Sequence, residues 1–234
     1  MAKIEKLDEL QIFAGQKDSP MAAMHRSVFL QYAAVGLASF SLAVASCKKE
    51  SSLPGINLGS GDIGILNYVY ALEQLEAAFY IQVTKSFYAG ATDAEQILLN
   101  DIRDHEIAHR EFFKNALGGV AIPSLDFNFS SIDFSSRSGV LESARALEDL
   151  GVSGYNGVGV LIRDEKYLAL AGKIVSVEAR HAALIRDLIT DGSFANSEVI
   201  GPNGLEKSLS PAEVLKAAAV YITTVIDAEN LPTA

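Results

Sequence analysis

Apolar and polar residues recur with a helical period along most of the chain after residue 61. The pattern predicts four long helices, which we expect to span Asp62 to about Gly90, Thr92 to Leu117, about Val140 to Ile162, and about Glu165 to Ile189. A fifth helix should open at residues 210–213, where serine, proline, alanine and glutamate supply a cap and a first turn, and reach about Ile226. The predicted fold class is therefore all-α.

The connections between these helices predict how the helices are arranged. The first connection is short, so the first two helices should be antiparallel neighbours, and Thr92-x-x-Glu95 is a capping box that marks the start of the second. Residues 118–138 contain a proline and several phenylalanines and serines, and are too irregular for a helix. They are long enough to travel the length of a bundle. We therefore expect a ferritin-like four-helix bundle with a long crossover between its second and third helices and an extra C-terminal helix.

A short motif occurs twice, once in the first predicted helix and once in the third. Residues 71–75 read Ala-Leu-Glu-Gln-Leu and residues 146–150 read Ala-Leu-Glu-Asp-Leu, and a tyrosine follows each glutamate by seven positions. A Glu-x-x-His pair follows each copy on the next predicted helix. The order Glu, Glu-x-x-His, Glu, Glu-x-x-His on four helices is the ligand order of a di-metal bundle.

Residues three apart on a helix share a face, with Cβ atoms roughly 5–6 Å apart, so each Glu-x-x-His pair can converge on one cation. The expected metal ligands are six residues: Glu73, Glu106, His109, Glu148, Glu178 and His181. Mixed carboxylate and imidazole ligands suit iron or manganese. Two divalent cations would neutralise four buried glutamates with the histidines uncharged, so we expect two iron ions, with manganese as the alternative. Structural ion pairs between helices are the other interpretation of the same residues.

One choice within this ligand set stays open. Glu76 lies on the same helix face as Glu73 and has the spacing to Glu106 that Glu148 has to Glu178. The repeated motif favours Glu73, because Gly151 stands in the second copy where Glu76 stands in the first.

Three side chains close to the expected ligands have alternative roles. Tyr80 and Tyr155 lie two turns beyond their glutamates on the same face, so they are either hydrogen-bond donors near the metal or core aromatics. His105 is adjacent to Glu106 and therefore points about 100° away from it, which favours a surface position or one just outside the ligands.

Composition narrows the classes of function. The 234-residue chain has a formal net charge of −10, contains no tryptophan and has no long basic run, which argues against a nucleic-acid partner. Its single cysteine excludes an internal disulfide framework and a cysteine-based metal ribbon.

The cysteine is better explained by the segment before it. Residues 28–45 are apolar and nearly uncharged, Arg26 precedes them, and the small residues 44–46 lead into Cys47. This arrangement resembles a bacterial lipoprotein signal, with Cys47 as the lipidated residue, and a transmembrane anchor is the alternative. We therefore expect a tail and signal peptide at residues 1–46, a flexible tether at 47–61 and the bundle at 62–226. The mature protein would be exported and anchored to a membrane, facing the periplasm or the cell surface.

The motifs also resemble those of a known family. Residues 72–80, 147–157 and 177–183 are similar to bacterial ferritin-like domain proteins related to plant desiccation-associated proteins, and the resemblance covers about residues 60–225. It implies a ferritin-like fold with a carboxylate-bridged di-iron centre as the ancestral site. The chain lacks a rubredoxin-like cysteine cluster, so it has no self-contained rubrerythrin electron path.

Two classes of function follow from these expectations. The first is an oxidoreductase in which Glu106 and Glu178 bridge two irons and O₂ or peroxide is reduced, with ferrous iron or another reductant as electron donor. The second is a non-catalytic, lipid-anchored stress or scaffold protein with a structural or vestigial metal site. Expected partners are metal ions, O₂ or peroxide and a membrane, and assembly into a homo-oligomer stays open.

Overall fold

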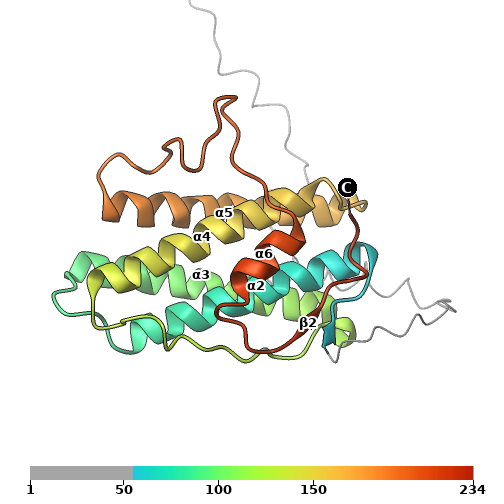
Figure 1. Cartoon of the computed structure of the whole chain (residues 1–234), viewed down its shortest axis with the longest axis horizontal. Helices are drawn as coiled ribbons and strands as arrows, with labels where there is room; N and C mark the ends of the chain where they lie inside the picture. Colours follow the sequence, from blue (N-terminus) through green and yellow to red (C-terminus); the bar gives the residue numbers. More distant parts are fainter. Residues whose placement is uncertain (1–54, 234) are drawn as a thin grey trace, which may run out of the picture. The chain divides into compact units, whose positions relative to one another are not determined.

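The computed structural model describes residues 55–233, and its architecture is the predicted all-α helical bundle (Figure 1). Four long helices form it: α2 (Gly61–Lys85), α3 (Asp93–Leu117), α4 (Arg137–Gly159) and α5 (Glu165–Ile189). A single 3₁₀ turn, η2 (Gly118–Val120), follows α3, and the extra helix α6 (Pro211–Ala218) packs against α4. The predicted bounds of the second and fourth helices agree with α3 and α5 to within one residue.

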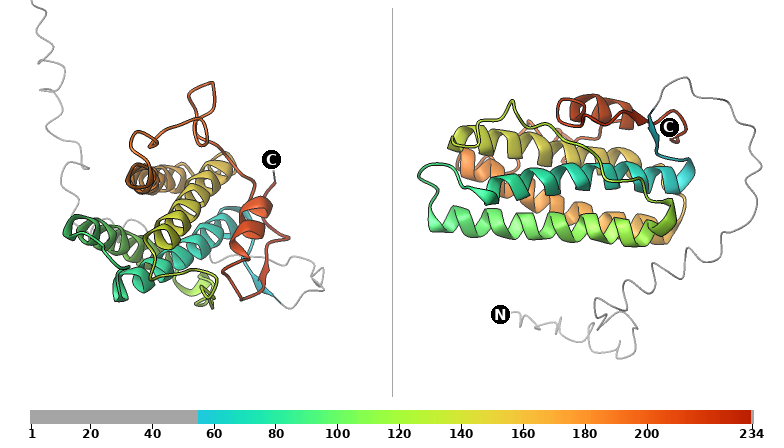
Figure 2. Two further views of the ribbon diagram at one scale, coloured as in Figure 1. Left: turned by 60° about the vertical axis from the view of Figure 1, so that its left-hand side comes forward. Right: turned by 90° about the horizontal axis from the view of Figure 1, so that it is seen from below.

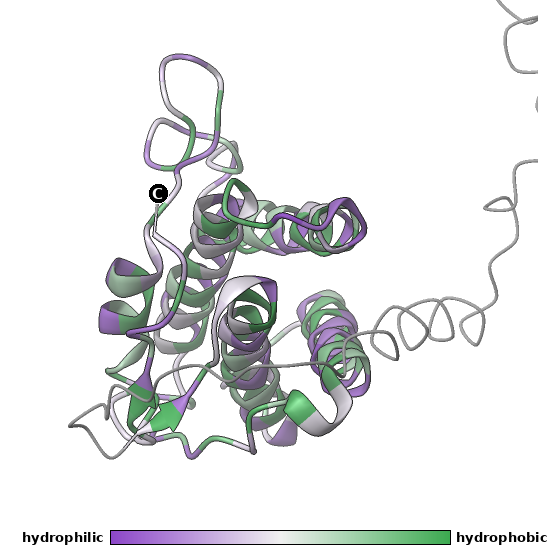
Figure 3. Ribbon diagram, turned by 90° about the vertical axis from the view of Figure 1, so that its right-hand side faces the viewer, coloured by the Kyte–Doolittle hydropathy of each residue, from purple (hydrophilic) through white to green (hydrophobic). Residues whose placement is uncertain are grey.

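The helices are arranged as two pairs. Helix α2 packs along α3, α4 packs along α5, and contacts between α2 and α4 join the pairs. The segment between η2 and α4 runs back along the bundle before the third helix starts, as the right-hand view of Figure 2 shows. This is the expected long crossover. Viewed along the helices in Figure 3, each long helix carries hydrophobic and hydrophilic segments, as expected for helices with one buried and one solvent-facing side.

Helix α2 is the most extensively buried of the four long helices. Most of its residues between Gly64 and Val83 are buried, including polar ones. It ends at Lys85, about one turn earlier than predicted. The predicted capping box then starts α3: the Thr92 hydroxyl accepts from the Glu95 amide at 3.2 Å, and the Glu95 carboxylate accepts from the Thr92 amide at 2.9 Å.

Two buried amide side chains of α2 hold the start of the crossover. The Asn67 amide donates to the Val120 carbonyl at 2.9 Å and accepts from the Ile122 amide at 2.9 Å. Two turns further along the same face of the helix, Gln74 accepts from the Leu125 amide at 2.9 Å. These bonds satisfy backbone groups of an irregular segment that has no regular backbone hydrogen bonds of its own. They therefore fix the start of the crossover on α2.

The C-terminal segment differs from the prediction. The capping box of Ser210 and Glu213 is present, but α6 ends at Ala218 and does not reach Ile226. Residues 220–226 are mostly β-branched, which disfavours helix and favours extended backbone. They lead into strand β2 (Ile226–Asp227), which pairs in parallel with β1 (Ile56–Asn57).

The same strand pair corrects the predicted tether. Residues 56–57 form β1, Leu58 is fully buried, and its amide donates to the Asp227 carbonyl at 3.0 Å. The prediction of a flexible segment is therefore wrong from β1 onward. The remainder of the predicted tether, Cys47 and the predicted signal at residues 1–46 lie outside the described residues. Among the helices of residues 55–233, none is both long enough and apolar enough to cross a membrane.

Candidate metal centre

The six predicted ligands converge in the interior of the bundle. They form two groups of four, and within each group one ligand atom per residue lies within 4.8 Å of the others. The first group is Glu73, Glu106, His109 and Glu178, and the second is Glu106, Glu148, Glu178 and His181. All four long helices contribute, and two glutamates, Glu106 and Glu178, belong to both groups.

The histidine of the first group, His109, turns Nδ1 toward three carboxylates. This atom lies 2.6 Å from Glu178 Oε1, 3.4 Å from Glu73 Oε2 and 3.8 Å from Glu106 Oε2. The Glu-x-x-His spacing on α3 thus brings His109 and Glu106 onto one inward face, as predicted.

The histidine of the second group, His181, has matching surroundings. Its Nδ1 lies 2.8 Å from Glu106 Oε1, 3.4 Å from Glu178 Oε2 and 3.6 Å from Glu148 Oε2. The two shared glutamates therefore use different oxygens toward the two histidines. Each presents one oxygen to each group, which is how a bridging carboxylate serves two cations.

The site has the donor set that a metal pair requires. All four carboxylates are fully buried, and the His109 and His181 side chains are only 13% and 5% exposed. Within residues 55–233, the inward oxygens of the shared glutamates and both Nδ1 atoms form no hydrogen bond of acceptable geometry. Buried polar atoms without hydrogen bonds are costly unless a cation binds them. These residues therefore fit two transition-metal ions.

Without metal, bound protons offset the negative charge of the clustered carboxylates. Burial and the charge of Glu178 raise the pKa of Glu106 to about 8. Burial opposes a charge on His109, but its contacts with Glu106, Glu178 and Glu73 outweigh this and raise its pKa to about 12. Burial likewise opposes a charge on Glu178, yet its contacts with both histidines lower its pKa to about 2. At neutral pH the histidines are therefore imidazolium ions that stand in for metal charge.

The two repeated tyrosines donate hydrogen bonds to the two unshared carboxylates, and they do so crosswise. Tyr80, on the helix of Glu73, donates to Glu148 Oε1 at 2.5 Å. Tyr155, on the helix of Glu148, donates to Glu73 Oε1. The other oxygen of each glutamate faces a histidine. Of the two roles left open by the sequence, the structure therefore places both tyrosines as donors to the cluster.

Glu76 lies outside both groups, so the structure brings Glu73 and not Glu76 to His109. Its carboxylate is buried, and neither oxygen has a hydrogen-bond partner among the residues described. A Cβ at Gly151 would lie 2.6 Å from Glu76 Oε1, so the glycine makes room for this fifth carboxylate. Burial first, and then the negative charges of the cluster, raise the pKa of Glu76 well above its ordinary value. This environment favours the protonated form of Glu76.

The sequence of the bundle matches a known family. The family model for the ferritin-like domain matches residues 61–191, which is more than half of the chain and includes both groups of ligands. The chain belongs to the ferritin-like domain family. A comparison with curated proteins finds no match.

One residue of this ferritin-like protein has a contact that its sequence did not reveal. His105 is exposed and turns away from Glu106 as expected, but its Nδ1 lies 3.0 Å from Nε2 of the predicted ligand His181. The contact joins α3 to α5. Helical spacing gives the direction of a side chain on its own helix, whereas this pairing depends on how two helices pack.

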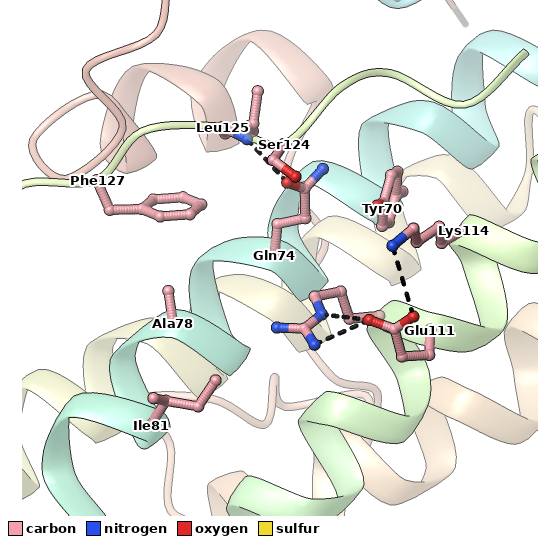
Figure 4. Close-up of a pocket in the computed structure, with 10 residues that line it drawn as sticks. Tyr70, Gln74, Ala78, Ile81, Glu111, Lys114, Ser124, Leu125 and Phe127 are labelled. Carbon is pink, nitrogen blue, oxygen red and sulfur yellow. Dashed lines mark hydrogen bonds and ion pairs between the residues drawn. The ribbon is translucent and has the colours of Figure 1, made fainter. Parts of the chain in front are cut away.

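The ferritin-like bundle also has a pocket away from the cluster, on the outer side of α2 and α3 (Figure 4). Its volume is about 460 Å³, and Tyr70, Gln74 and Phe127 are among its lining residues. Its charges are paired with one another: Arg110 contacts Glu111 at 2.8 Å, and Lys114 contacts Glu111 at 3.8 Å. No cluster residue lines it. The cluster of carboxylates and histidines that could hold metal is therefore in the bundle interior and not in this pocket.

Proposed function

We propose that this ferritin-like protein binds two transition-metal ions, preferably iron, and reduces O₂ or peroxide with electrons from ferrous iron or another reductant. The observation that carries the proposal is the division of the shared carboxylates. Glu106 and Glu178 each turn one oxygen toward the group of His109 and the other toward the group of His181. Structural ion pairs alone do not require this arrangement, whereas two adjacent cations do.

The charge of the site suits a metal pair. Four ionised glutamates and two neutral histidines balance two divalent cations, so the loaded centre is neutral in a buried environment. Such an iron pair supplies one-electron oxidation and reduction at each ion. Manganese accepts the same carboxylate and imidazole donors, so the donor set does not distinguish the two metals.

The surrounding residues supply protons and hold the ligands. Reduction of one peroxide molecule to two waters consumes two electrons and two protons; two ferrous ions, as substrate, can give one electron each. The raised pKa of Glu76 favours its protonated form, so this side chain can serve as a proton donor inside the bundle, beside a centre that needs protons. Tyr80 and Tyr155 keep the unshared carboxylates oriented through their hydrogen bonds.

The test begins with the purified metal-free domain. It should take up close to two ferrous ions per chain without oxygen, and then consume added O₂ or peroxide as ferric absorbance appears. Glu178→Ala should abolish at least half of the uptake, because Glu178 belongs to both groups. Glu111→Gln, a change on the outer pocket of α3, is the matched control and should bind as the wild type does.

Failure of ferrous uptake by a folded wild-type protein would refute the metal site. Uptake of two ions without any consumption of O₂ or peroxide would refute the oxidoreductase and leave a bundle stabilised by metal.

The cellular location is part of the proposal and rests on the sequence alone. The apolar segment 28–45 and the small residues before Cys47 support export, cleavage and lipid attachment at Cys47. One acyl chain binds membranes only weakly, so stable anchoring needs a second chain or another membrane-binding signal.

A further inference from the structure

A third histidine touches the cluster from outside. His105 belongs to neither ligand group, and its side chain is exposed at the edge between α3 and α5. Its Nδ1 lies 3.0 Å from Nε2 of His181, within hydrogen-bond distance. His105 is thus the only histidine of the described bundle that contacts a predicted ligand without facing the carboxylates.

The geometry of the two rings is that of a hydrogen bond. Their planes are within 7° of parallel, and their centroids are 5.2 Å apart. The two nitrogens are much closer than the centroids, so the rings meet through their edges and not through their faces. A ring nitrogen donates and accepts in the plane of the ring, which is the direction that this arrangement uses.

Metal binding fixes the direction of this bond. His181 turns Nδ1 to the three carboxylates of its group, so Nδ1 is the atom that would bind a metal. A ligating nitrogen must be unprotonated, so the proton of the neutral ring is on Nε2. That Nε2–H can donate to Nδ1 of His105, which must then hold its own proton on the outer nitrogen.

The other half of the cluster has no equivalent. Over residues 55–233, no side chain hydrogen-bonds Nε2 of His109, although its Nδ1 faces three carboxylates just as that of His181 does. His105 therefore makes two otherwise similar half-sites unequal. The hydrogen-bond partner of a ligating histidine sets its tautomer and orientation, and loss of such a partner typically lowers metal affinity about 10–100-fold.

We propose that His105 is a positioning residue: it accepts a hydrogen bond from His181 Nε2–H and holds Nδ1 of that ligand free for metal. The half-site of His181 consequently binds its ion first and more tightly than the half-site of His109. The inference rests on the proposed two-metal centre.

The test is an oxygen-free titration of the metal-free protein with Mn²⁺. Binding is measured by calorimetry and by the electron paramagnetic resonance signal of free Mn²⁺. The wild type should bind two ions in two steps of different affinity. His109→Ala should keep the tighter step, and His181→Ala should lose it. His105→Phe, which keeps a ring but has no acceptor, should weaken the tighter step about 10–100-fold.

Two further variants separate positioning from packing. His105→Asn places an amide oxygen near the position of Nδ1 and should recover most of the lost affinity. Asp104→Asn, an exposed neighbour on α3, should change neither step. In the Zn²⁺-loaded protein, the nitrogen NMR signals of His181 should show the proton on Nε2, protected from exchange in the wild type and exposed in His105→Phe.

The outcomes distinguish this inference from the proposed function. Two steps of equal affinity in the wild type, a tighter step that disappears in His109→Ala, or unchanged binding in His105→Phe would overturn the role of His105 and leave the metal site standing. A folded wild-type protein that binds no Mn²⁺ and no Fe²⁺ would overturn both.

Discussion

The Tyr80 hydroxyl on α2 donates a hydrogen bond to the Glu148 carboxylate on α4 at 2.5 Å, and not to Glu73 on its own helix. Tyr155 makes the reciprocal bond to Glu73. Each copy of the repeated motif therefore supplies a ligand to one half-site and a hydrogen-bond donor to the other. The repeat is thus a feature of one joint centre and not of two independent helices.

Removal of either tyrosine hydroxyl should destabilise the metal-free protein. Tyr80→Phe or Tyr155→Phe leaves a buried carboxylate oxygen without its donor, which costs about 1–3 kcal/mol and more for a charged group. Urea unfolding of the metal-free protein should show this loss. Tyr221→Phe is the control, because the Tyr221 hydroxyl makes no hydrogen bond within the described chain and the change should cost little. Equal stability of all three variants would show that the tyrosines only fill space.

The metal-free protein should lose stability as the pH rises through neutrality. The pKa of Glu106 is raised from 4.5 to about 8 in the folded state, so its contribution is fully present below pH 4.5 and is lost as the pH approaches about 8. The pKa of His109 is raised from 6.5 to about 12, so its contribution declines from pH 6.5 upward. The lowered pKa of Glu178 acts in the opposite sense, but only as the pH falls from 4.5 toward about 2.

Metal binding reverses this dependence, because protons compete with metal for the same atoms. Metal at a hundredfold excess over its dissociation constant stabilises the native state by about 2.7 kcal/mol, and less as the pH falls. The difference in melting temperature between loaded and metal-free protein should therefore shrink from about pH 8 to about pH 5. Differential scanning calorimetry measures it. A difference that grows on acidification would show that these glutamates do not form one metal-binding cluster.

Glu76 and Glu73 should respond differently to the same substitution. Glu76→Gln replaces a buried acid, whose raised pKa favours the neutral form, by a neutral amide of the same shape. Metal content and stability should stay near wild type, while peroxide reduction slows for lack of an internal proton donor. Glu73→Gln removes a charged ligand and should lower the affinity of one ion. Metal analysis and stopped-flow absorbance measure the two effects. Loss of metal in Glu76→Gln would instead make Glu76 a ligand.

Lipid attachment can be tested on the full-length chain expressed in a bacterial host. Cys47→Ser should leave the precursor uncleaved and without acyl groups, because the modified atom is the cysteine sulfur. The bundle should still fold, since it lies beyond the changed position. Mass spectrometry of the wild type showing an intact N-terminus and no acyl mass would contradict lipidation at Cys47.

The sequence predicted most of the fold because its signals are local. Thr92 and Glu95 specify the start of α3 through a capping box, and glutamates and histidines three apart mark inward faces that do not depend on distant contacts. The repeat likewise selected Glu73 over Glu76, the choice that the structure places beside His109.

The features that the sequence did not predict all depend on contacts between segments that are far apart in the chain. The last helix stops at Ala218 because the residues after it are mostly β-branched and lead into β2. Strand β2 pairs with β1, which precedes the first helix of the bundle. The predicted tether is ordered from residue 56 for the same reason. For His105 the sequence offered a surface position or one just outside the ligands, and the structure shows both, but its partner His181 could not be predicted because the contact exists only when α3 and α5 are packed together.

The pairing of β1 with β2 has a consequence for how the domain is made. Asn57 meets Asp227 both in the strand register and through a 2.7 Å side-chain bond, with a sequence separation of 170 residues. On a ribosome the helices can pair as each hairpin emerges, but this contact cannot form until residue 227 has also emerged. Contacts between residues so far apart in sequence are slow to form because a long loop must close first. Chains shortened before residue 226 should thus keep their helices and the ligands of both half-sites, yet expose the edge of β1 to other chains.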